Sequence, residues 1–600
     1  MAGVIKVMNV VDSCFKLNQT RDVWSTARDN TMLRNIETND FENISMQHDD
    51  KRVAIGSMEQ VSEVLVTSKL SLSKKISNMK SSESGEIVNG ECDVSTSVVK
   101  EETSGNAKFS AGLRRIPFNE VGEEMASLTK IACPIVMTSL LIFSRSLISM
   151  WFLSHLGKVE LAGGALAMGF GNITGVSVLK GLSVGMDPIC GQAFGAKRWT
   201  VLSHTFQKMF CLLTAVSIPI AVAWLNIEPI FLRLGQDPDI TRVAKTYMVF
   251  FVPELLAQAM LHPLRTFLRT QGLTSPLTIS AIISILLHPL FNYVFVVRMR
   301  LGVEGVAVAM AFNTMNINAG LLVYTCFSDS LIKPWEGLAL RSLFRGWWPL
   351  LSLAAPSAIS VCLEYWWYEI MLFLCGLLGN PKASVSAMGI MIQTTGLLYV
   401  VPFAISTAIA TRVGHALGGG QPTRAQCTTV IGLILAVAYG LSAAVFVTAL
   451  RSVWGKMFTD EPEILGLISS ALPILGLCEI GNSPQTAACG VLTGTARPKD
   501  GARVNLCAFY IVGLPVAVTS TFGFKVGFCG LWYGMLAAQI TCLVMMLCTL
   551  IRTDWEHQVK RAEALTAAAA DRSRSEEEAI HTEVENDDDL EIGLLQNTND

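Results

Sequence analysis

The hydrophobic and polar positions divide the chain into three regions. Residues 1–122 are polar, residues 123–551 are overwhelmingly apolar, and the chain becomes charged from Arg552 onward. A membrane-spanning helix needs about 20 consecutive apolar residues. The apolar region predicts twelve such helices, near 129–153, 161–187, 203–225, 244–263, 273–297, 303–327, 347–376, 384–410, 425–450, 464–490, 503–523 and 526–551.

Landmark residues recur at a nearly constant distance along the apolar region. Pro134 lies 222 residues before Pro356, and the stretch Cys190–Arg198 shares a Gly-x-Ala-x-Gly pattern with Val413–Gln421. Glycines four residues apart share one helix face and allow two helices to approach closely, so these stretches predict helix packing, with gating as an alternative. The repeat predicts an all-α membrane protein made of two related six-helix halves, an organisation typical of secondary transporters.

The three regions and the repeat give five predicted domains. Residues 1–122 form a disordered N-terminal extension, 123–327 the first six helices and 347–551 the last six. The segment 328–346 links the halves, and 552–600 is an acidic, disordered tail. An even number of spans places both tails on one side, and the distribution of Lys and Arg near the helix ends favours the cytoplasm for the tails and the linker.

Composition excludes several classes of protein. Charged residues make up 16% of the chain, against about 25% in a soluble protein. The net charge of −3 does not indicate nucleic-acid binding, and the fifteen cysteines include no CxxC pair that would indicate a zinc site or a disulfide framework. His288 and His415 are isolated and are interpreted as structural. We expect neither an enzyme nor a bound cofactor.

Charged residues inside the predicted helices are few. Each costs at least ~2.5 kcal/mol on insertion scales, so each needs a partner or a function. In the first half, Arg145, Lys180 and Glu254 are predicted to neutralise one another, with Asp187 at the end of helix two. Alternatively, the two basic side chains attract an anionic substrate. The second half carries Glu364, Glu369 and Glu479.

Glu364 is the main candidate for proton or substrate binding. It lies about seventeen residues into helix seven and precedes Trp366, Trp367 and Tyr368. At about 100° per residue, Tyr368 shares its face whereas Glu369 lies about 140° away, so the carboxylates do not form a simple pair. A carboxyl group desolvated by aromatic neighbours can bind and release a proton near neutral pH. The aromatic rings offer faces for a flat or cationic substrate. The alternative is a structural glutamate bonded to neighbouring helices.

Helix ten carries a dense polar patch around a proline. Glu479, Asn482 and Gln485 flank Pro484, and such a break in an apolar helix is typical of a transporter site. Lining of a cavity is favoured over a merely kinked packing helix. Gln393 lies in a milder polar patch on helix eight.

Several stretches together resemble the multidrug and toxic compound extrusion (MATE) family in its plant form. They are Leu161–Gly164, Gly185–Ala196, Pro402–Phe403, Thr411–Gly414, Glu364–Trp367 and Gly490–Pro498. The resemblance covers about 120–552. It implies two six-helix lobes around a central cleft and cation-coupled export of organic solutes by alternating access. In plant members the coupling ion is usually a proton, and the acid of helix seven corresponds to Glu364.

The chain departs from the family pattern at two positions. Prokaryotic relatives carry an aspartate in helix one, where this chain reads Leu147–Trp151 without an acid. An acid is also frequent in helix ten just before the VLxG motif, where this chain has Gln485, Thr486 and Ala487. Coupling through the first half is therefore not expected, and Glu479 is a candidate for the missing acid of helix ten.

The sequence thus predicts a proton-coupled antiporter that exports xenobiotics, secondary metabolites or hormones. The alternatives are a lipid-linked flippase, which predicts a strongly cationic cleft open sideways to lipid, and a channel or membrane-embedded sensor. The expected partners are a small organic solute, protons and the lipid bilayer, without nucleic acid, and the protein is expected to be a monomer. Plasma, vacuolar, Golgi and endosomal membranes all remain open, as does Na⁺ in place of H⁺.

Overall fold

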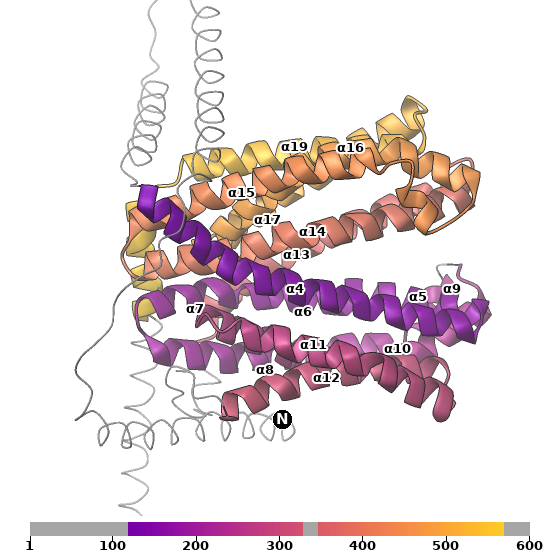
Figure 1. Ribbon diagram of the computed structural model, residues 1–600, viewed down its shortest axis with the longest axis horizontal. Helices are drawn as coiled ribbons and strands as arrows, with labels where there is room; N and C mark the ends of the chain where they lie inside the picture. Colours follow the sequence, from indigo (N-terminus) through magenta and orange to yellow (C-terminus); the bar gives the residue numbers. More distant parts are fainter. Residues whose placement is uncertain (1–117, 234, 328–345, 569–600) are drawn as a thin grey trace, which may run out of the picture. The chain divides into compact units, whose positions relative to one another are not determined.

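The computed structural model describes residues 118–233, 235–327 and 346–568, and the regular elements in these ranges are helices. Twelve of them are long and apolar enough to cross a membrane, which confirms the predicted number (Figure 1). Most of the predicted N-terminal extension, nearly all of the linker and residues 569–600 lie outside the described ranges. The first helix begins at Phe118, a few residues before the predicted boundary.

The first six spans form the N-lobe. Its elements are α4 (Phe118–Leu156), α5 (Lys158–Gly171), η1 (Asn172–Val176), α6 (Ser177–Val184), α7 (Met186–Gly195), α8 (Trp199–Leu225), α9 (Glu228–Arg233), α10 (Pro238–Thr270), α11 (Ser275–Asn292), η2 (Tyr293–Arg298) and α12 (Val303–Phe327). The second span is one continuous stretch from α5 to α7, in which η1 is a short π-helical segment.

The last six spans form the C-lobe. Its elements are α13 (Trp348–Cys375), α14 (Pro381–Gly418), α15 (Pro422–Ala449), η4 (Trp454–Met457), α16 (Pro462–Gly494), α17 (Pro498–Asn505), η5 (Leu506–Gly513), α18 (Leu514–Val518), η6 (Thr519–Gly523) and α19 (Phe528–Ile551). Spans two and eight both have 38 residues, and spans four and ten both have 33. These equal lengths agree with the duplication inferred from the landmark residues.

Local sequence fixes where several of these helices begin. Asp237 caps α10 by accepting hydrogen bonds from the backbone N–H groups of Asp239 and Ile240, and Asn380 caps α14 in the same way. A proline occupies the first turn of α10, α14, α15, α16 and α17, where its missing N–H group has no partner to lose. The polar caps therefore set the first residues of helices whose approximate positions follow from hydropathy.

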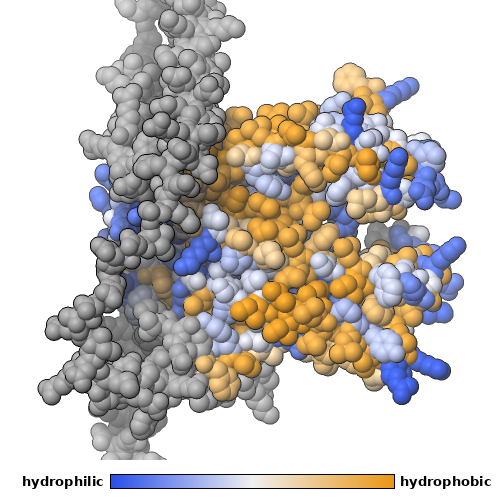
Figure 2. Space-filling model, viewed as in Figure 1, coloured by the Kyte–Doolittle hydropathy of each residue, from blue (hydrophilic) through white to orange (hydrophobic). Residues whose placement is uncertain are grey.

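Each lobe has its own apolar core and an apolar outer surface. Trp224 and Tyr247 are fully buried in the N-lobe core, and Trp367 and Trp532 are fully buried in the C-lobe core. Apolar residues cover the middle of the helices, and hydrophilic residues gather at the helix ends on the right of the view, where α9 lies (Figure 2). This distribution suits a hydrocarbon layer about 30 Å thick.

The prediction of a disordered tail from Arg552 onward is wrong for residues 552–568. Asp554 caps a helix at 555–568, whose Trp555 and Ala562 side chains are buried against the C-lobe. Arg561 donates a hydrogen bond to the backbone oxygen of Ala496 at 3.1 Å. The helix is amphipathic, and the charge count that predicted a solvated tail does not detect its apolar face.

Candidate functional site

A cavity of about 120 Å³ lies between the two lobes. The N-lobe contributes residues of α6, α7 and α10 to its wall, and the C-lobe contributes residues of α13, α14, α16 and α17. Four of the residues singled out in the sequence line it, namely Lys180, Asp187, Glu364 and Gln485. Residues separated by about 300 positions in the chain therefore meet at one site.

Glu364 reaches the cavity from α13 and is half-buried. Its carboxyl group makes no hydrogen bond and no ion pair with any residue of the described ranges. Lys180 of the opposite lobe interacts with it electrostatically across the cavity. The site therefore holds a carboxyl group without a fixed partner, next to a cation that belongs to the other lobe.

Lys180 does not neutralise Glu254, in contrast to the prediction from the sequence. Its ammonium group donates a hydrogen bond of 3.0 Å to the Tyr365 hydroxyl and lies 4.4 Å from the centroid of the Phe403 ring. Both partners belong to the C-lobe. Lys180 precedes Gly191 by eleven residues and Phe403 precedes Gly414 by eleven, so matching positions of the two repeats meet at the site.

Two arginines of α10 belong to the cavity wall, although the sequence distinguishes them only as charges near a helix end. Arg269 forms an ion pair of 2.7 Å with Asp187, which also accepts a hydrogen bond from Thr266. Arg265 lies one helical turn before Arg269 and faces the same cavity. The spacing of four residues was the signal, because side chains at i and i+4 share a helix face.

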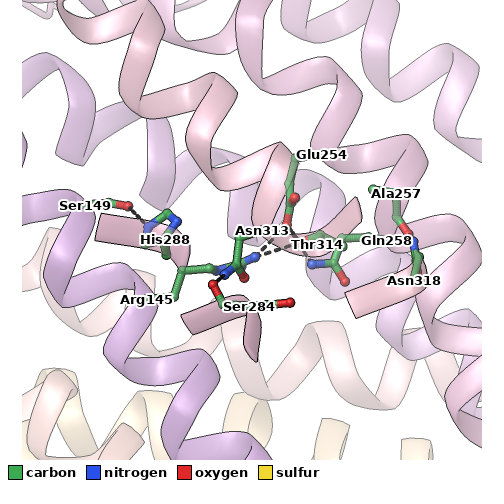
Figure 3. Close-up of polar contacts among 10 residues, drawn as sticks. All are labelled: Arg145, Ser149, Glu254, Ala257, Gln258, Ser284, His288, Asn313, Thr314 and Asn318. Carbon is green, nitrogen blue, oxygen red and sulfur yellow. Dashed lines mark hydrogen bonds and ion pairs between the residues drawn. The ribbon is translucent and has the colours of Figure 1, made fainter. Parts of the chain in front are cut away.

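Arg145 and Glu254 form the predicted ion pair deep inside the N-lobe. One guanidinium nitrogen lies 3.2 Å from a Glu254 oxygen and donates to the Thr314 hydroxyl at 2.7 Å. Gln258 and Thr314 also donate hydrogen bonds to this carboxylate, at 2.7 and 2.9 Å (Figure 3). His288 lies nearby and bonds to Ser149. This network is built from N-lobe helices alone, and it does not reach the cavity wall.

Glu479 lies in the C-lobe interior rather than on the cavity wall. It is 1% exposed and accepts hydrogen bonds of 3.2 Å from the Asn482 amide, whose oxygen accepts a bond from Gln539. Gln485 and Thr486, one to two turns later on α16, do line the cavity. Helix ten therefore contributes amide and hydroxyl groups to the cavity wall, whereas its acid, Glu479, lies behind that wall in the C-lobe interior.

The other predicted aromatic and polar residues lie away from the cavity. Trp367 is fully buried in the C-lobe core and Tyr368 packs against that core, whereas Trp366, Glu369 and Gln393 are exposed on the outside of their helices. Trp366 follows Glu364 by two residues and so points about 200° away from it. The aromatic side chains in the wall come instead from α14, as Tyr399 and Phe403.

The two repeated glycine motifs lie against each other where α7 packs on α14. A methyl group at Gly418 would overlap the backbone oxygen of Gln192, and one at Gly195 would overlap that of His415. Phe194 stacks on the His415 ring with 4.7 Å between centroids. The motifs therefore hold the two lobes in backbone contact where α7 packs on α14.

Glu124 adds to this contact between the lobes, and no pattern in the sequence pointed to it. It lies in the second turn of α4 and is 3% exposed. Arg412 donates hydrogen bonds to both of its oxygens, at 2.8 and 2.5 Å, and Thr428 donates another at 2.7 Å. Glu124 precedes the first predicted span, so it is not among the charges inside the predicted apolar helices.

Comparisons with known proteins agree with this architecture. The MatE family model matches residues 134–294 and 356–519. The chain is 91% identical over 485 residues to Protein DETOXIFICATION 53 of Arabidopsis thaliana, covering 80% of this chain and 100% of that protein. It is 50% identical to Protein DETOXIFICATION 48 of the same plant, covering 77% and 87%.

The fold is also similar to solved structures. The crystal structure of the eukaryotic MATE transporter AtDTX14 matches with a TM-score of 0.71 and 31% identity, over 74% of this chain and 100% of that one. The Vibrio cholerae MATE transporter VcmN, as its D35N mutant, matches with a TM-score of 0.64 over 73% and 100%, and at 16% identity it supports the fold alone.

Proposed function

The chain belongs to the MatE family and is an integral multi-pass membrane transporter, and on this premise we propose that it exports small organic solutes in exchange for protons by alternating access. One observation carries the proposal. Glu364 lies in a cavity between the lobes and has no fixed partner among the described residues. Such a carboxyl group can take up and release a proton as its surroundings change.

The cross-lobe attraction between Glu364 and Lys180 suggests how exchange is enforced. When the cavity is empty and the carboxyl group ionised, this attraction opposes separation of α13 from α6. A proton on Glu364 removes the attraction, and a solute that engages the wall replaces it. Either event then permits the lobes to rearrange, whereas the empty, ionised form stays in place.

Vesicle transport tests this proposal. The full chain is reconstituted into liposomes, a pH gradient is imposed, and uptake of a labelled solute panel is compared for the wild type, Glu364→Gln and Glu369→Gln. We expect gradient-driven exchange to fall by about tenfold or more in Glu364→Gln. Glu369→Gln is the control, because that residue lies outside the cavity, and it should keep wild-type exchange. Undiminished exchange in Glu364→Gln would remove Glu364 from the mechanism. A parallel Na⁺ gradient identifies the coupling ion.

A lipid-linked flippase is the second candidate, because three cationic side chains line the cavity. That function also needs a path to the bilayer. Gly181 and Gly185 place α6 so close to α13 that a methyl group at either would overlap the backbone of Ala358 or Ala354, and α4 packs along α14. This packing narrows a sideways path between these helices and favours a solute that enters from water.

A further inference from the structure

We propose that the cavity binds organic anions, with the anionic group held between Lys180 and Arg265 and an aromatic or apolar part against Tyr399 and Phe403. The inference rests on the proposed function for the location of the substrate site only. It adds the chemical class of the substrate and the residues that select it.

The charges of the cavity wall do not balance. Its charged residues are Lys180, Arg265, Arg269, Asp187 and Glu364. Arg269 and Asp187 neutralise each other through their ion pair of 2.7 Å. Lys180 and Arg265 then outnumber the single carboxyl group of Glu364, so the wall carries one excess positive charge when Glu364 is ionised. A partly enclosed site with excess positive charge attracts anions and repels cations.

Arg265 has the features of an anion ligand. It makes no hydrogen bond or ion pair with any residue that the structure describes, and its Nε atom is buried without a partner. The rest of the side chain is partly buried beside the Arg269–Asp187 pair, so its guanidinium donors gain from meeting an acceptor. Its planar donors match a carboxylate, sulfonate or phosphate group in a bidentate arrangement. Arg265 also borders a second, smaller cavity beside α4, which leaves room around its head group.

Lys180 selects against cations as well as for anions. Its ammonium group lies 4.4 Å from the Phe403 centroid and 5.4 Å from that of Tyr365. Aromatic faces of this kind are where an organic cation would bind, and here the protein's own cation takes the position. The hydrogen-bond partner of Lys180 is the neutral Tyr365 hydroxyl, so its charge remains available to an anion.

The two lobes divide the work of binding. All three cations of the wall belong to the N-lobe, whereas the C-lobe contributes the rings of Tyr399 and Phe403 together with neutral groups such as Gln485. An anion bound to Lys180 weakens the attraction between Lys180 and Glu364. A proton bound to Glu364 weakens the same attraction. Substrate and proton thus act on opposite partners of one cross-lobe interaction.

A matched ligand series tests the inference. Binding of 1-naphthoate, 1-naphthamide and 1-naphthylmethylammonium to the purified full chain in nanodiscs of zwitterionic lipid is measured by equilibrium dialysis. The three probes share a ring system and differ in charge. We expect 1-naphthoate to bind about tenfold or more tightly than the cation. Lys180→Gln and Arg265→Gln should each lose about tenfold for 1-naphthoate while 1-naphthamide binding stays unchanged. Lys382→Gln, at an exposed lysine of α14, is the control.

Several results would overturn the inference: tighter binding of the cation, no measurable binding of 1-naphthoate to folded wild type, or an equal loss for all three probes in the variants. Competition by added phosphatidylglycerol would assign the cations to a lipid headgroup and also overturn it. The proposed function fails separately. If 1-naphthoate binds selectively but no solute responds to a pH gradient, proton exchange is wrong and the anion site stands. If the pH gradient drives transport of a cation that binds better than 1-naphthoate, the anion site is wrong and proton exchange stands.

Discussion

The two lobes repeat one fold, but they surround a buried acid at nearly the same depth with opposite kinds of partner. Glu254 lies sixteen residues into α10 and Glu479 seventeen residues into α16. In the N-lobe, Arg145 neutralises the acid. Arg145 follows the proline of α4 by eleven residues, and the residue eleven after the proline of α13 is Trp367. The C-lobe thus has a tryptophan where the N-lobe has the cation.

This difference separates a lobe whose buried acid keeps its charge from a lobe whose acids can bind and release a proton. An acid paired with a buried guanidinium group keeps its charge, because protonating it would leave the arginine unpaired. Glu479 instead meets an asparagine amide, and Glu364 meets no fixed partner in the described ranges. We infer that the N-lobe network serves stability and that proton binding belongs to the C-lobe, in agreement with the absence of an acid at Leu147–Trp151.

The largest effect should come from separating the N-lobe pair. Glu254→Gln or Arg145→Met leaves one buried charge without its partner and should destabilise the protein by about 3 to 5 kcal/mol. Thermal unfolding of the purified protein in detergent measures this. The double variant Arg145→Met with Glu254→Gln removes both charges and should recover much of the loss. If Glu254→Gln were as stable as the wild type, the pair would not be structural.

The next largest effect tests whether both copies of the glycine motif are needed to hold the lobes together. Gly195→Ala and Gly418→Ala each place a methyl group against a backbone oxygen of the other lobe. Transport in liposomes should fall by about tenfold or more for both, because a displacement of about 1 Å at a closed interface disrupts alignment. Gly169→Ala is the control, since open space surrounds that position. A loss in only one of the two variants would show that the copies are not equivalent.

The smallest effect should come from the C-lobe counterpart of Glu254. Glu479→Gln keeps a hydrogen-bonding group beside Asn482 and leaves no cation unpaired. The free energy of unfolding should therefore change by about 1 kcal/mol or less. The same thermal measurement, run beside Glu254→Gln, gives the comparison directly. A destabilisation as large as that of Glu254→Gln would mean that the C-lobe also contains a buried cation paired with this acid.

Much of the fold and part of the site could be predicted from the sequence. The twelve spans followed from apolar length, because each helix must cross the hydrocarbon layer by itself. Glu364 stood out because a charge within an apolar helix is rare. Trp366 and Trp367 were assigned to the site by their closeness in sequence, but a helix turns successive residues to different faces. Arg265 and Glu124 lie near helix ends, where charged residues are common, so neither stood out in the sequence.

The sequence by itself determined the helices, their repeat and the buried acids, since all of these depend on residues within one helix or on matching patterns along the chain. Only the tertiary structure decided which cation meets which acid. Arg145 reaches Glu254 within the N-lobe, whereas Lys180 crosses to Tyr365 and Phe403 of the C-lobe. Such contacts join residues from about 110 to 220 positions apart. They depend on how helices and lobes pack, and hydropathy does not encode that packing.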